Sequence, residues 1–163
     1  MKRFAKWAAI LAIIIFVPIQ FVRPSRTNPV ADPKFAMEME LQVPTDVSAT
    51  LHRACGDCHS NGTHWPWYSE VAPTSWFVAD HVNSGRRHIN FSNWVRPGKE
   101  PKDSEDRLTA ICREVKAGAM PLSSYLLIHW NSKLSEGDKT QICAWTDEEI
   151  NRLAASATKP AGN

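Results

Sequence analysis

Hydrophobic residues form one long apolar run near the N-terminus and shorter, helically spaced stripes through the rest of the chain. Residues 7–22 are almost continuously apolar, whereas residues 23–43 are rich in proline and hold few apolar positions. From residue 44 onward, apolar side chains recur at intervals of three and four, as on one face of a helix. No segment alternates apolar and polar residues as a half-buried strand would. The sequence therefore predicts an all-α body with long loops.

Capping residues and helix breakers divide this body into five expected helices. Thr45 and Ser104 stand at N-cap positions, because their hydroxyl oxygens can accept hydrogen bonds from free backbone N–H groups. Ser135 begins a Ser-x-x-Asp sequence that resembles a capping box, and Gly118 suits a left-handed helix end. The expected helices are residues 46–55, 75–84 (ended by Gly85), 105–117, 122–130 and 135–153.

Three basic residues precede the apolar run, and this order is typical of a secretion signal or a membrane anchor. The 16 residues of the run would span about 24 Å as a helix, less than the roughly 30 Å hydrocarbon core, although Phe4 and Ala5 can extend it. Residues 20–24 offer no small-residue cleavage site. We therefore expect a membrane helix over residues 5–22 that holds the body outside a bacterial cytoplasmic membrane.

Two other interpretations of this N-terminal segment remain. A cleaved signal would leave a soluble periplasmic body, and a buried core helix would leave the leading basic cluster unexplained. The expected organisation is a signal-anchor at residues 1–22, a Pro-rich linker at 23–43, one domain at 44–158 and a tail at 159–163.

The charge pattern argues against a nucleic-acid partner. The chain has a formal net charge of +2, but five of its 19 basic residues lie within the first 26, where there is no acid. The remaining residues hold 14 basic and 17 acidic side chains, a balance of −3. The body therefore lacks the basic surface that binding to a phosphate backbone requires.

Residues 55–59 read Cys-Gly-Asp-Cys-His, and Cys-x-x-Cys-His is the attachment signature of a c-type haem. On a helix, positions i, i+3 and i+4 share one face. Cys55 and Cys58 can then form thioether bonds to two vinyl groups, while His59 lies beneath the iron as its first axial ligand. Because only one such motif occurs, we expect one covalent haem c with its iron.

Two other kinds of site also use paired cysteines. A thioredoxin-type motif would follow a strand in an α/β fold, and a structural zinc site would usually need a second paired cluster. No strand is expected here, and Cys112 and Cys143 are isolated. A thiol-redox or zinc-stabilised interaction module without haem is therefore the hypothesis to revive if no covalent haem is attached.

The second axial ligand is expected from a Gly-Ala-Met-Pro loop after the third helix. Met120 can reach the iron from this loop, and a Met/His ligand pair raises the potential of a cytochrome haem. One of several histidines could replace it, or the sixth position could lack a strong ligand. These competing histidines are His64, His81, His88 and His129.

The helix that enters the motif, the Met120 loop and a closing helix with Trp145 together resemble a monohaem cytochrome c. The closer resemblance is to the haem-binding domain family of short, membrane-anchored bacterial proteins. It implies one covalently bound haem outside the cytoplasmic membrane and leaves the redox partner unnamed. The stretches that carry it are residues 55–76, 85–94, 120–135 and 142–145, with WPWYS and NFSNW the most specific sequences.

Aromatic residues directly after the motif are candidate walls of the haem pocket. Trp65, Trp67 and Tyr68 can cover the porphyrin and exclude water, which raises the potential by disfavouring the charged oxidised centre. In a small domain this role overlaps with that of an ordinary aromatic core, because the haem is itself much of the core.

The propionates need hydrogen-bond donors, for which Arg86, Asn90 and Trp94 are the candidates. Guanidinium and indole N–H groups suit buried carboxylates, whereas a solvated charge is the alternative for the arginine. Tyr125 can reach either a propionate or the Met120 loop.

Cys112 and Cys143 fall at apolar positions of the third and last helices. An oxidising compartment would favour a disulfide between them, and two buried thiols are the alternative.

The expected function is that of a membrane-associated single-electron carrier rather than an enzyme. Its partners would be redox proteins, with the chain acting as a free tethered carrier or as a subunit of a respiratory or photosynthetic complex. The alternative is a haem enzyme or a gas or peroxide sensor with a labile sixth ligand, in which His64, His81 or His129 supplies acid–base chemistry.

Overall fold

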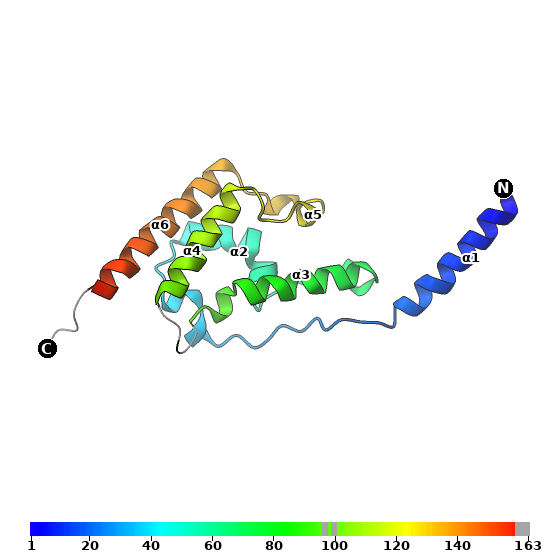
Figure 1. The fold of residues 1–163 in the computed structure, drawn as a ribbon, viewed down its shortest axis with the longest axis horizontal. Helices are drawn as coiled ribbons and strands as arrows, with labels where there is room; N and C mark the ends of the chain where they lie inside the picture. The colour runs from blue at the N-terminus through cyan, green and yellow to red at the C-terminus, as the bar shows by residue number, and fades with distance from the viewer. Residues whose placement is uncertain (96–97, 99–100, 159–163) are drawn as a thin grey trace.

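The computed structural model describes residues 1–95, 98 and 101–158, so the expected tail at 159–163 lies outside the described residues. All regular elements of the described chain are helices and none is a strand, which confirms the all-α prediction (Figure 1). Its α-helices are α1 (Lys2–Ile19), α2 (Thr45–His59), α3 (Thr74–His88), α4 (Pro101–Lys116), α5 (Ser123–Leu126) and α6 (Glu136–Thr158). Its short 3-10 helices are η1 (Pro33–Phe35), η2 (Met37–Met39), η3 (Trp67–Glu70), η4 (Phe91–Asn93) and η5 (Trp130–Ser132).

Several helix boundaries differ from the sequence expectation. Thr45 is the first residue of α2 rather than its N-cap, which is Pro44 and makes no side-chain cap bond. Packing between distant segments decides the other differences. α2 continues past Cys55 to the end of the motif. α3 runs through Gly85 to His88 instead of ending at the glycine. Ser104 lies inside α4, where its hydroxyl donates to Glu40 Oε1 at 2.9 Å rather than capping the helix.

Local signals elsewhere place helix ends correctly. Gly118 has a φ of +65°, the left-handed conformation that ends α4. Before α6, the Asp138 N–H donates to Ser135 Oγ at 3.0 Å and the Ser135 N–H donates to Asp138 Oδ2 at 2.8 Å, which completes the expected capping box. The helix expected at 122–130 is only the single turn α5, followed by η5.

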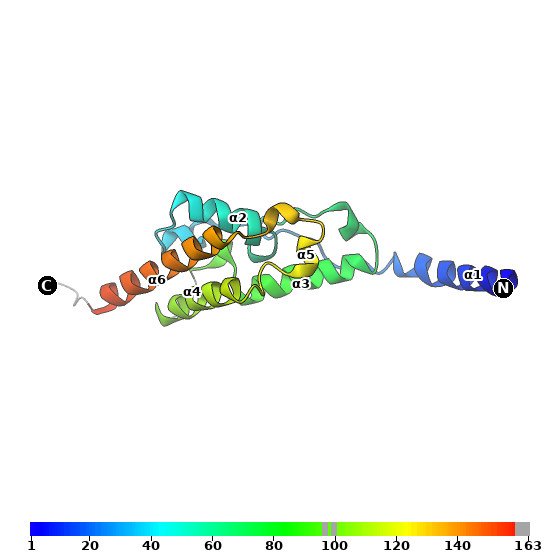
Figure 2. The same cartoon turned by 90° about the horizontal axis from the view of Figure 1, so that it is seen from above.

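The hydrophobic core lies where α2, α4 and α6 meet. α4 packs along α6, and α2 packs against both α6 and α3 (Figure 2). A disulfide joins Cys112 of α4 to Cys143 of α6. The core side chains are Met37, Leu41, Val47, Leu51, Ala54, Phe91, Trp94, Leu108, Ile111, Val115, Leu134, Ile142, Trp145 and Leu153.

Part of the expected linker belongs to this core. Met37 and Leu41 are only 2% and 3% exposed and pack in the main cluster. The Phe35 carbonyl accepts from the Trp94 N–H at 2.7 Å, which ties η1 to the segment after η4. The folded body therefore begins before residue 44.

Residues 20–28, here called the strap, run along η3 and α3 (Figure 1). Gln20 makes two hydrogen bonds with the Ala72 backbone, donating to its carbonyl at 3.1 Å and accepting from its N–H at 2.9 Å. The Trp76 indole N–H donates to the Val22 carbonyl at 2.6 Å. The strap is thus held to the domain from its first residue.

α1 projects from the strap and has no buried side chain (Figure 2). The sequence favours a membrane-crossing helix over residues 5–22, and the structure does not support this expectation. Among the described residues, no helix combines the length and apolarity needed to cross a membrane. α1 ends at Ile19 after 18 residues, about 27 Å of helix, with Pro18 in its last turn.

We predict that the Cys112→Ala/Cys143→Ala double variant unfolds more easily than the native chain. The disulfide spans a sequence separation of 31, and the loop-entropy relation gives a loss of about 3–4 kcal/mol in the free energy of unfolding. Denaturant titration measures this change. Reductant should shift the midpoint of the native protein toward that of the variant, and an unchanged midpoint in the variant would contradict the prediction.

Candidate functional site

The Cys-x-x-Cys-His sequence forms the last turn and a half of α2. Because a helix repeats every 3.6 residues, Cys55, Cys58 and His59 lie on one face, and all three line a single cavity. Cys55 and Cys58 are half-buried free thiols and are not bonded to each other. The structure thus gathers the three residues that the sequence motif singles out.

The cavity has a volume of about 540 Å³ and is enclosed by α2, α3, α4 and the loop before α5. This volume falls within the range of about 300–1,000 Å³ that is usual for small-molecule and cofactor sites. Apolar side chains cover much of its wall: Leu51, Ala54, Ile89, Phe91, Ile111, Val115, Pro121 and Leu122.

The imidazole of His59 is held in one tautomer. Its Nδ1 donates to the Ile89 carbonyl at 3.0 Å, which leaves Nε2 as the unprotonated nitrogen. Burial lowers the pKa of His59, so the ring is neutral near pH 7. A neutral imidazole oriented by a backbone carbonyl is the usual form of a metal ligand.

The two thiols are protonated in the unmodified chain. Burial, reinforced by Cys58, raises the pKa of Cys55 to about 12. Burial, reinforced by Asp57, raises the pKa of Cys58 to about 11. Thiol-redox motifs show the opposite behaviour, because their attacking cysteine has a lowered pKa.

Three of the expected candidates for a second axial ligand line the same cavity, namely Met120, His81 and His88. His81 Nδ1 donates to the Phe77 carbonyl at 2.8 Å and His88 Nδ1 donates to the Ser84 carbonyl at 2.9 Å. Each histidine therefore keeps Nε2 free, while Met120 reaches the cavity from the loop between α4 and α5.

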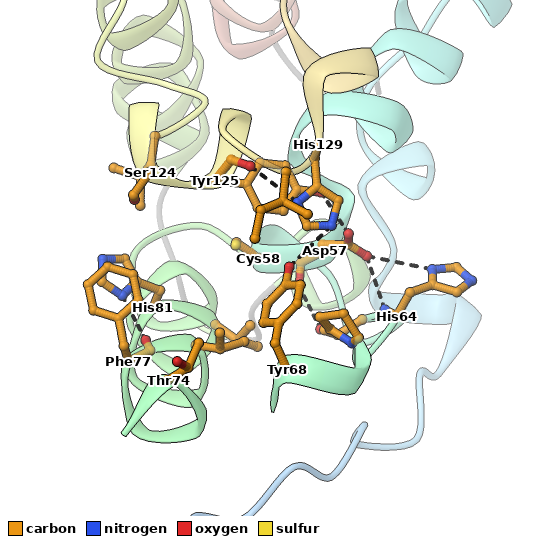
Figure 3. Close-up of a pocket in the computed structure, with 16 residues that line it drawn as sticks. Asp57, Cys58, His64, Tyr68, Thr74, Phe77, His81, Ser124, Tyr125 and His129 are labelled. Carbon is orange, nitrogen blue, oxygen red and sulfur yellow. Dashed lines mark hydrogen bonds and ion pairs between the residues drawn. The ribbon is translucent and has the colours of Figure 1, made fainter. Parts of the chain in front are cut away.

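A smaller cavity of about 120 Å³ adjoins the larger one, and Asp57 and Tyr125 line both (Figure 3). The other two candidate histidines, His64 and His129, line only this smaller space. The Tyr125 hydroxyl donates to Asp57 Oδ2 at 2.7 Å, and its ring stacks on His129 at 4.1 Å. Tyr68 also lines the smaller cavity, with its hydroxyl 3.3 Å from His129 Nε2.

Arg107 and Arg113 of α4 line the larger cavity, and the sequence reasoning missed both. Arg107 is 8% exposed, and its guanidinium lies 4.0 Å from the centroid of the Trp94 ring. Trp94, which the sequence favoured as a propionate donor, is fully buried and does not line the cavity. The guanidinium groups of the two arginines suit a carboxylate. The sequence offers one sign that Arg107 faces the interior, because it directly precedes Leu108 of the apolar stripe of α4.

Besides Tyr68 and Trp94, four other predicted site residues lie outside the larger cavity. The Trp65 indole donates to Asn28 Oδ1 at 3.2 Å, and Arg86 Nη2 donates to the same oxygen at 2.9 Å, so both hold the strap. Asn90 caps η4 through its side-chain oxygen. Trp67 is 79% exposed.

Gly85 allows α3 to approach α2 directly behind the motif. A Cβ at this position would lie 2.6 Å from the Cys58 carbonyl oxygen, which is closer than real Cβ atoms come. The helix therefore needs glycine here for contact, not for a left-handed turn. This contact also places the Ile89 carbonyl, one turn further along, against His59.

Comparison with known proteins identifies the family of the chain. The family described as the haem-binding domain matches residues 14–148 of the chain. The chain belongs to the haem-binding domain family. No curated protein and no solved structure matches it.

The residues of the cavity fit a haem. Two half-buried thiols and a neutral histidine with a free Nε2 face an apolar space of cofactor size, and the guanidinium groups of Arg107 and Arg113 line its α4 side. No three His, Cys, Asp or Glu side chains of the described chain gather as ligands for a bare metal ion. The donor set instead offers single axial ligands, as an iron already held by a porphyrin requires.

We predict that Gly85→Ala destabilises the haem-binding domain. The added methyl would force α3 away from the Cys58 backbone, and overpacking of this kind costs about 1–3 kcal/mol in the free energy of unfolding. Denaturant titration of the variant measures the loss.

Gly137→Ala in the first turn of α6 is the matched control. Its Cβ would lie 3.6 Å from Ser135 Oγ, an ordinary contact, so its stability should stay equal or rise slightly. Equal stability of Gly85→Ala and the native chain would show that α3 does not need this close approach.

Proposed function

We propose that this haem-binding domain protein is a monohaem c-type cytochrome that carries single electrons outside the cytoplasmic membrane. The observation that supports this most directly is the convergence of Cys55, Cys58 and His59 on one cavity, with His59 Nε2 left free by the bond to Ile89. Two thiols and a histidine at this spacing match what covalent attachment through two thioethers and one axial bond requires.

When bound, haem supplies a one-electron Fe(III)/Fe(II) couple. Cys55 and Cys58 would hold it covalently, and His59 would be its first axial ligand. The Ile89 carbonyl keeps the imidazole oriented and neutral. The apolar wall keeps water away from the site, which favours the less charged, reduced centre and raises its potential.

Met120 is the proposed second axial ligand. Its loop is tied to the motif helix by the hydrogen bond from Tyr125 to Asp57, which lies between the two cysteines. His88, by contrast, is close enough to His59 to contribute to its lowered pKa, which places it on the side of the first ligand. A loop fixed against α2 can hold a thioether in one position throughout a redox cycle.

Arg107 and Arg113 are the proposed donors to the haem propionates. Both line the cavity, and guanidinium groups suit carboxylates. Arg86, which the sequence favoured for this role, instead donates to the Ser60 carbonyl at 2.8 Å and to the strap.

We further propose that the domain works on the outer side of a bacterial cytoplasmic membrane, with redox proteins as partners. Lys2, Arg3 and Lys6 precede the apolar part of α1, as in export signals. The disulfide between α4 and α6 agrees with an oxidising compartment. A free carrier and a subunit of a respiratory or photosynthetic complex both fit this proposal.

We predict that Cys58→Ala impairs covalent attachment. After expression with haem-attachment machinery, the variant should lose one thioether bond, which shifts the reduced visible spectrum and lowers the yield of denaturation-resistant haem. The Cys112→Ala/Cys143→Ala variant is the control, because its cysteines lie outside the cavity, and it should keep both bonds. A reduced spectrum and a yield of denaturation-resistant haem equal to those of the native chain would refute the c-type assignment.

We predict that Met120→Ala keeps the haem attached but opens the sixth position. The reduced protein should then bind carbon monoxide rapidly, and the reduction potential should fall by tens of millivolts or more, since axial ligands tune haem potentials over about 0.8 V. His81→Ala and His88→Ala are the comparison variants and should change neither property strongly. If one of these histidine variants opens the iron instead, that histidine is the ligand.

Rapid carbon monoxide binding by the native protein would point to a different function. A labile sixth position fits a haem enzyme or a gas or peroxide sensor, whereas a low-spin spectrum unchanged by carbon monoxide fits an electron carrier.

A further inference from the structure

Five large apolar side chains are exposed on or beside the segments that line the smaller cavity. Phe77 lines this cavity (Figure 3), as does Ile128, while Trp67, Leu127 and Trp130 lie on η3, at the end of α5 and on η5. Trp67, Leu127 and Trp130 are 79%, 83% and 80% exposed. This set of five side chains is here called the apolar rim. Clustered exposure of this kind marks a binding surface, since single exposed apolar residues are common but contiguous patches are not.

The strap joins this rim to α1 without a free linker. Gln20, one residue beyond α1, is bonded twice to Ala72 beside η3, and the Trp76 indole next to Phe77 donates to Val22. η3 and α3, which hold the strap, therefore also carry Trp67 and Phe77 of the rim. Figure 1 shows the root of α1 beyond the N-terminal end of α3, with α5 above that helix.

α1 exposes its apolar residues on every side, with none buried against the domain. Phe4, Trp7 and Ile14 are 81%, 69% and 61% exposed, an arrangement that suits hydrocarbon better than water. The basic residues that precede this surface suit anionic headgroups. Because no described helix is long and apolar enough to cross a membrane, a second point of contact would add to the binding that α1 provides.

We propose that the apolar rim and α1 form one lipid-binding surface, which seats the haem-binding domain on an anionic bilayer with η3 and α5 at the headgroups. The rim contains no charged side chain, and two of its five members are tryptophans, whose amphipathic rings favour the membrane interface. The proposal rests on the membrane-associated placement given under Proposed function. It adds that the domain itself touches lipid and therefore has a fixed orientation.

Partition of the full haem-loaded chain onto phosphatidylcholine vesicles containing phosphatidylglycerol tests this proposal. Leu127→Ser/Trp130→Ser removes apolar contact while α1 stays intact, and it should weaken partition about tenfold or more. The matched control is Val30→Ser/Met39→Ser, which changes two residues that are 96% and 64% exposed but lie outside the rim. The control should partition like the native chain, and equal partition of all three proteins would overturn the proposal.

Quenching by vesicles with brominated acyl chains locates the contact independently. Emission from Trp67 and Trp130 should be quenched and that from buried Trp94 and Trp145 should not, so the Trp67→Phe and Trp130→Phe variants should each lose part of the quenched signal. Quenching that comes from Trp7 of α1 alone would overturn the proposal.

The visible spectrum of the same samples reports separately on the proposed function. Absence of covalent haem with normal rim-dependent partition would refute the cytochrome assignment and leave the lipid surface standing. Normal spectra together with partition that depends only on α1 would overturn the lipid surface and leave the cytochrome assignment standing. Specific capture of a redox protein by the rim, without any effect of the rim variants on vesicle binding, would assign the surface to a protein partner instead.

Discussion

The close approach of α3 to the end of α2 determines most of what this site can do. At Gly85 the two backbones come so near that no side chain fits between them, and the Cys58 carbonyl occupies the place of a Cβ. One turn later the Ile89 carbonyl reaches His59 and fixes its tautomer. The same placement makes α3 one wall of the cavity, with His81 and His88 facing into it. A single missing methyl group thus allows α3 to form a wall of the cavity and its end to fix the tautomer of His59.

The sequence predicts those features that depend on local spacing. The one-sided arrangement of Cys55, Cys58 and His59 follows from the helical repeat alone. The capping box at Ser135 and the left-handed Gly118 follow equally from near neighbours in the chain, and the structure shows both. The helical class follows from the spacing of apolar positions over whole segments. In each case the information lies within one or two turns of the residues concerned.

Sequence reasoning misses features that depend on distant contacts, because the same residue type fits more than one role. Glycine is typical of helix ends, yet Gly85 lies inside α3 and allows a close approach between two helices. Trp65 suits a wall of the haem pocket and Arg86 suits a haem propionate, yet the structure uses both on the strap through Asn28. Arg107 looks like a solvated helix residue until its stacking on Trp94 is seen. Only the three-dimensional arrangement separates these roles.

The strap connects the apolar N-terminus to the candidate haem site. Its contacts fall into two sets, of which Gln20 and Val22 lie next to α1, while Arg26 and Asn28 bind nearer the motif. Arg86 bridges the second set to Thr63, whose hydroxyl donates to the Asp57 carbonyl within the motif. Since α1 buries no side chain and both sets belong to residues 20–28, removing α1 would leave these contacts in place. The candidate site therefore needs no contact from α1 to fold, and α1 bears instead on the membrane placement proposed above.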